Sequence, residues 1–113
     1  MRIINRSAFV VRPRDPYLHW AAALDDDPAD TADDLRERVA IYLVPEDLKG
    51  ENETPPIEDF YRRIFELELE AWWTDQAHWP MQRDLATFRE WFEVTAESVV
   101  VDLADEAIEI EEI

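Results

Sequence analysis

The segment from Pro56 to about Trp73 constrains the fold most, because it can form one long helix with a wide apolar face. Thr54-Pro55-Pro56 followed by Glu58 and Asp59 is a strong helix start, since proline and acids are favoured in the first turn. Two adjacent apolar rows follow at helical spacing: Ile57, Phe60, Ile64, Leu67 and Ala71, then Tyr61, Phe65 and Trp72. Such a face must be covered by another layer.

Three segments are predicted to be strands that supply this layer. The first is residues 3–12, in which both alternating faces carry apolar and polar side chains, and Pro13 ends this predicted strand. Residues 39–44 are apolar on both faces, which is typical of a central strand. Residues 93–103 return to strand, with the valines at 99–101 expected to be buried on both sides. The sequence therefore predicts an α+β, two-layer domain with about three strands packed against the long helix.

Shorter helices are predicted around this framework. One runs from Pro16 to about Leu24, a second from Thr31 to about Glu37, and a third follows Asp84 as its N-cap. We expect residues 1–103 to form the single domain. Residues 104–113 are acidic and contain the alternating run Ile108-Glu109-Ile110-Glu111, which predicts an edge strand or a tail.

Composition excludes several classes of site. The chain has 113 residues, enough for one core, with no cysteine and only one glycine, Gly50, for which we predict a turn. Phosphate-binding loops need several glycines and thiol chemistry needs cysteine, so no cofactor is predicted. We find neither a membrane-spanning apolar run nor a signal peptide, and we expect a cytoplasmic location with no membrane partner.

The charge is large and unevenly placed. Lys and Arg number 11 against 28 Asp and Glu, for a net charge of −17. Residues 1–24 hold four arginines and one aspartate, so the remaining residues carry −20. This field disfavours nucleic acid and favours a basic protein partner, although a solvated acidic surface is the simpler interpretation.

Glu68 is the candidate buried acid. Its position in the long helix lies between the two apolar rows, so its carboxylate points at the core. A buried carboxylate must be paired, hydrogen-bonded or neutral. We expect a structural pair with an inward base, for which Arg6 and Arg12 are the candidates, and we keep a proton-transfer role as the alternative.

Four of the five tryptophans lie between residues 72 and 91. The simplest interpretation is that they belong to the core, but Trp73 projects toward the charged side of the helix and Trp79 sits in a turn. Trp73 and Trp79, with His78, are therefore the candidate partner or ligand surface. Asp75 and His78 offer only two metal ligands, so no metal site is predicted, and no residue is assigned a catalytic role.

Several segments together resemble a family of small, acidic bacterial proteins of uncharacterised function. The resemblance covers nearly the whole chain, and it implies a bacterial cytosolic single domain without transferring any catalytic residue. The segments are residues 5–13, 41–46, 65–75, 79–80, 91–92 and 101–103.

Two hypotheses for function follow. The first is a non-enzymatic interaction or regulatory module that engages a basic partner. The second is a small-molecule-binding domain or enzyme with a pocket built from Glu68, His78 and tryptophans. A pocket that holds Glu68 and His78 together would favour the second, and a filled core with an exposed tryptophan patch would favour the first.

Overall fold

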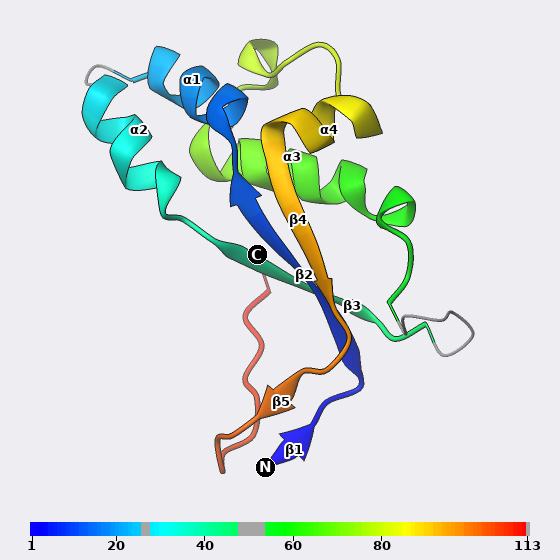
Figure 1. Cartoon of the computed structure of the whole chain (residues 1–113). Helices are drawn as coiled ribbons and strands as arrows, with labels where there is room; N and C mark the ends of the chain where they lie inside the picture. Colours follow the sequence, from blue (N-terminus) through cyan, green and yellow to red (C-terminus); the bar gives the residue numbers. More distant parts are fainter. Residues whose placement is uncertain (26–27, 48–53, 113) are drawn as a thin grey trace.

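A three-stranded antiparallel sheet forms one layer of the molecule (Figure 1). Its order is β3-β2-β4, with β2 (Arg6–Pro13) at the centre, flanked by β3 (Ala40–Pro45) and β4 (Phe92–Glu97). The computed structural model describes residues 1–25, 28–47 and 54–112. Helices cover one face of the sheet, which confirms the predicted α+β fold.

The described residues also form four α-helices and two short 3₁₀ turns. They are α1 (Asp15–Ala23), α2 (Pro28–Arg36), η1 (Ile57–Asp59), α3 (Tyr61–Trp72), η2 (Gln76–His78) and α4 (Leu85–Trp91). Asp84 caps α4 as predicted, since its side chain accepts a hydrogen bond from the Thr87 amide at 2.8 Å. Within the described ranges no helix combines the length and apolar character needed to cross a bilayer.

The predicted long helix is shorter than the sequence indicates. Its first turn is the separate η1, and Phe60 then leaves helical geometry with φ −126° before α3 begins. The Phe60 ring lies 6.3 Å from that of Phe9 on β2. This aromatic contact accompanies the break and joins the start of α3 to the sheet.

The core lies between α3 and the helix-facing side of the sheet. Phe9 and Val11 of β2 point into it, because alternate strand residues share a face. Phe65 of α3 is completely buried, with its ring centroid 5.7 Å from Phe88 and 5.6 Å from Phe92. Aromatic side chains therefore provide much of the volume that holds the two layers together.

All three strand predictions need correction. Residues 3–12 do not form one strand, because β1 (Arg2–Ile3) ends before β2 begins at Arg6 and the two lie in different sheets. Residues 40–45 form an edge strand rather than a central one, and Ile41 is 65% exposed on the helix-free face. Residues 93–103 do not form one strand, since β4 ends at Glu97 and Val99 is exposed. In these last two segments, apolar residues on both faces wrongly predicted that both faces would be buried. The turn predicted at Gly50 lies outside the described residues.

Candidate functional site

A two-stranded ribbon projects from the sheet (Figure 1). It pairs β1 (Arg2–Ile3) with β5 (Val101–Asp102) in antiparallel register. Residues 103–112 follow β5 without regular structure. We call β1, β5 and residues 103–112 the acidic arm, because its tail carries Asp105, Glu106, Glu109, Glu111 and Glu112 and no base.

The molecule is more extended than a compact domain of its length. The radius of gyration is 15.8 Å, whereas a compact domain of this length has about 13 Å. The solvent-accessible surface is 8160 Å², against about 6,500 Å² for a compact monomer of this mass. Both differences have the sign expected when part of a chain stands away from the core.

Arg2 fixes the start of the tail. Its guanidinium pairs with the Asp102 carboxylate and also donates to the carbonyl oxygens of Ala104 at 3.2 Å and Glu106 at 2.7 Å. From Ala107 to Glu112, the described residues make no hydrogen bond or ion pair. Their backbone donors and acceptors are therefore available to another chain.

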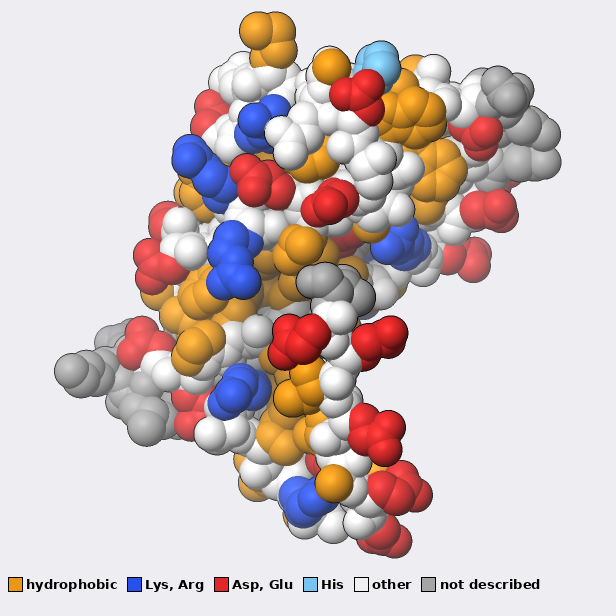
Figure 2. All heavy atoms as spheres, turned by 180° about the vertical axis from the view of Figure 1, so that it is seen from behind, with side chains coloured by type: hydrophobic (Ala, Val, Ile, Leu, Met, Phe, Trp, Pro, Cys, Tyr) orange, Lys and Arg blue, Asp and Glu red, His pale blue; other side chains and the backbone are white. Residues whose placement is uncertain are grey.

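The tail also exposes large aliphatic side chains. Ile108 is 62% and Ile110 is 80% exposed, and Leu103 is exposed as well. Figure 2 shows acidic side chains along one side of the lower half of the molecule, where the arm lies. Residues 107–112 of the arm thus combine a backbone without hydrogen bonds in the described chain, exposed aliphatic groups and dense negative charge, and the alternating run predicted from sequence lies there.

Glu68 is buried, as its helical position predicts, with 6% of its surface exposed. The Tyr42 hydroxyl donates a hydrogen bond to its carboxylate, and Arg38 is the nearby cation. Burial raises the pKa of Glu68, and Arg38 and the Tyr42 hydrogen bond oppose that rise. Burial, with the charge of Glu68 as a lesser cause, raises the pKa of Tyr17 to about 12, and that of Tyr42 rises for the same reasons.

The predicted inward bases are wrong. Arg6 is exposed and donates to the backbone and side-chain oxygens of Asn5, both at 2.8 Å, and Arg12 is also exposed. Arg38, in the connection between α2 and β3, is instead the cation whose charge acts on Glu68, although its own side chain is exposed and the two form no ion pair within the described residues. No periodic pattern marked it, because its approach to Glu68 depends on the packing of the layers.

The side chains of the predicted Trp73 and Trp79 surface are mostly engaged in contacts within the protein. Trp79 is buried and donates from its indole nitrogen to the Trp73 carbonyl at 2.7 Å. Trp73 is half-buried and donates to Nδ1 of His78 at 3.1 Å. Trp20 of α1 donates to the His78 carbonyl at 2.8 Å. These contacts join α1 to the connection between α3 and α4, so the simpler interpretation, a structural cluster, fits them.

His78 does not line the cavity beside Glu68. The cavity beside Glu68 holds about 10 Å³ and is lined by Pro13, Tyr17, Arg38 and Phe92. That volume admits about one water molecule and no organic substrate. His78 instead faces Asp75, with Nδ1 3.5 Å from its carboxylate, and no larger group of potential metal ligands occurs among the described residues.

Comparisons with protein-family models, curated proteins and solved structures gave no match. The resemblance to small acidic bacterial proteins therefore stays a prediction. Function has to be argued from the geometry of the chain itself.

Proposed function

We propose that this protein is a non-enzymatic interaction module that binds a basic protein through the acidic arm. The observation that carries the proposal is the exposure of Ile108 and Ile110 in residues 107–112, an acidic stretch that makes no hydrogen bond or ion pair within the described parts of the chain. Contiguous exposed apolar groups mark contact surfaces in water-soluble proteins. The proposed setting is the bacterial cytoplasm, following the resemblance of the sequence.

Strand addition is the mode of binding that fits the arm. An extended segment can pair its free amides and carbonyls with the edge of a partner sheet, and its alternate side chains then face opposite sides. Ile108 and Ile110 share one side and Glu109 and Glu111 share the other. The isoleucines would enter apolar positions on the partner, while the glutamates would pair with its lysines or arginines.

A peptide of alternating lysine and valine, about ten residues long, tests the proposal. Its binding to the full chain can be followed by amide chemical shifts in NMR at about 50 mM and about 500 mM salt. We expect shifts concentrated in residues 101–112 and affinity that falls about tenfold or more at high salt, since exposed charges are then screened. A peptide of alternating glutamate and valine should not bind.

Matched variants separate the two contributions. Ile108→Ser with Ile110→Ser removes the apolar contacts, and Glu109→Gln with Glu111→Gln removes two charges without changing shape. We expect the first pair to weaken binding about tenfold and the second to weaken it less and to reduce its salt dependence. The control pair, Glu66→Gln with Glu70→Gln on α3, should have little effect. Equal binding by all three double variants would refute the role of the arm.

A further inference from the structure

We infer that a cavity between β4 and the helical layer binds a small organic carboxylate with an apolar body. The cavity has a volume of about 430 Å³, which is within the usual size range of small-molecule sites. It lies in the body of the molecule and shares no lining residue with the acidic arm. The inference therefore does not depend on the proposed function.

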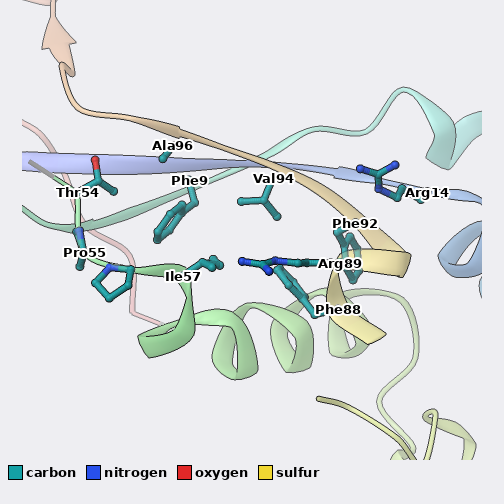
Figure 3. Close-up of a pocket in the computed structure, with 11 residues that line it drawn as sticks. Phe9, Arg14, Thr54, Pro55, Ile57, Phe88, Arg89, Phe92, Val94 and Ala96 are labelled. Carbon is teal, nitrogen blue, oxygen red and sulfur yellow. The ribbon is translucent and has the colours of Figure 1, made fainter. Parts of the chain in front are cut away.

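Aromatic and aliphatic groups form the walls. Figure 3 shows Phe9 and Val94 extending from the sheet toward Ile57 and Phe88 on the helical side. The remaining apolar lining comes from Pro55, Pro56, Phe92 and Ala96. At water's liquid volume of about 30 Å³, the space corresponds to about a dozen non-hydrogen atoms. A compact ring or branched chain fits these walls.

The charged lining is cationic, although the protein as a whole is acidic. Arg14 and Arg89 are the charged residues that line the cavity. Strand periodicity explains the absence of the β4 acids, because Phe92, Val94 and Ala96 face the cavity while Glu93 and Glu97 face the opposite side. A carboxylate at this site would therefore meet positive charge in a chain of net charge −17.

Arg89 is placed to receive the carboxylate. In Figure 3 its side chain runs from α4 between Val94 and Phe88 toward Ile57. Among the described residues, its guanidinium forms one long ion pair, with the nitrogen 3.8 Å from the Glu58 carboxylate and both side chains more than half exposed. Such pairs contribute little, so a ligand carboxylate could replace Glu58 in a closer, two-point contact.

Arg14 marks one end of the cavity, beyond Phe92 in Figure 3. Its backbone is fixed, since its amide donates to the Trp91 carbonyl at 2.8 Å and its carbonyl accepts from Leu18. Its side chain forms no ion pair within the described residues. It supplies a second positive charge to the site without a competing carboxylate.

The tail of a second copy is a less suitable occupant. If it added to the free edge of β4 with Ile108 and Ile110 in the cavity, Glu109 and Glu111 would lie on the same face as Glu93 and Glu97. Like charges across neighbouring strands are destabilising. A separate small ligand avoids this repulsion.

Three probes of similar shape test the site: phenylbutyrate, phenylbutyramide and phenylbutylamine. We expect the carboxylate to bind the full chain about tenfold more tightly than the amide and the amine to bind least, measured by calorimetry and by amide shifts around the cavity. In contrast to the arm, the site should not lose affinity steeply as salt rises. Salt screens the attraction of the anion to the arginines, but it also screens the repulsion of the anion by the net negative charge of the protein. Equal binding of the three probes, or no binding, would overturn the inference.

Variants assign the effect to the arginines. Arg89→Gln should weaken phenylbutyrate about tenfold, Arg14→Gln about threefold, and Glu58→Gln should strengthen it about twofold. Arg89→Glu should invert the order of the probes, and the exposed Arg62→Gln on α3 is the control. Thermal melts establish that each variant is folded. If Ile108→Ser with Ile110→Ser instead raises probe affinity and converts a dimer to a monomer, the tail of a second copy occupies the cavity and the inference fails.

Discussion

The body of this protein, meaning its helices and three-stranded sheet, and the acidic arm differ in how they place apolar side chains. In the body, the helical layer and the sheet enclose fully buried groups such as Phe65 and Phe88. In the arm, a two-residue ribbon and an extended tail leave Leu103, Ile108 and Ile110 exposed. The difference shows that apolar residues in this chain stand in two environments, since those of the body are packed in the core and those of the arm are exposed to solvent.

Truncation of a core aromatic should have the largest effect on stability. Phe65→Ala removes a ring in contact with Phe88, Trp91 and Phe92, and we expect it to lower the free energy of unfolding by about 3–5 kcal/mol. Ile110→Ala in the arm should change it by less than about 0.5 kcal/mol. Urea denaturation followed by tryptophan fluorescence measures both. Similar losses for the two variants would show that the arm is packed into the body.

Substitution of Glu68 should have an intermediate effect on the free energy of unfolding. Glu68→Ala leaves the Tyr42 hydroxyl without its acceptor and opens a small void, so we expect a loss of about 2 kcal/mol. Glu68→Gln keeps an oxygen acceptor and should preserve most of the stability. Denaturation at neutral pH compares the two variants with wild type.

The pH dependence separates the charge of Glu68 from its shape. Because burial raises the folded pKa of Glu68 above 4.5, the folded state binds its proton more tightly than the unfolded chain does. Its contribution to stability is therefore greatest below pH 4.5 and decreases as the pH rises through the folded pKa. Glu68→Gln should remove this decrease. A wild-type and a Gln variant with parallel stability profiles above pH 4.5 would contradict the assignment.

Local patterns in the sequence predicted much of the body. The proline and acid signals placed α1 and α4 closely, and helical spacing correctly turned Glu68 toward the core. These features depend on residues near one another along the chain. The α+β class followed from the order of helices and strands.

Features that depend on distant packing were missed or misplaced. Arg38 is the cation near Glu68 because the two line one small cavity with Pro13, Tyr17 and Phe92, an arrangement of distant segments that no spacing reveals. Trp79 is buried because its turn folds back on Trp73. The sequence hypothesis of a pocket named Glu68, His78 and tryptophans, none of which lines the cavity beneath β4, because the walls of that cavity come from segments far apart in the chain.

Arg2 should have the smallest effect on global stability and a clear local one. Its ion pair with Asp102 is partly exposed, so Arg2→Ala should change the free energy of unfolding by less than about 0.5 kcal/mol. Its loss also frees the Ala104 and Glu106 carbonyls, so amide order parameters in residues 103–106 should fall below about 0.6. NMR relaxation measures this change, and the exposed Arg62→Ala is the control.

The same variant tests whether the arm is pre-organised for binding. A held tail loses less conformational freedom on meeting a partner than a free one does. We therefore expect Arg2→Ala to weaken binding of the lysine and valine peptide about threefold, even though the contacting residues are unchanged. Arg2→Lys keeps the charge but has a single ammonium in place of the guanidinium fork, so it should give an intermediate affinity. If Arg2→Ala loosens the tail and the affinity for the peptide is unchanged, Arg2 only orders the ribbon and the start of the tail, and it makes no contribution to binding.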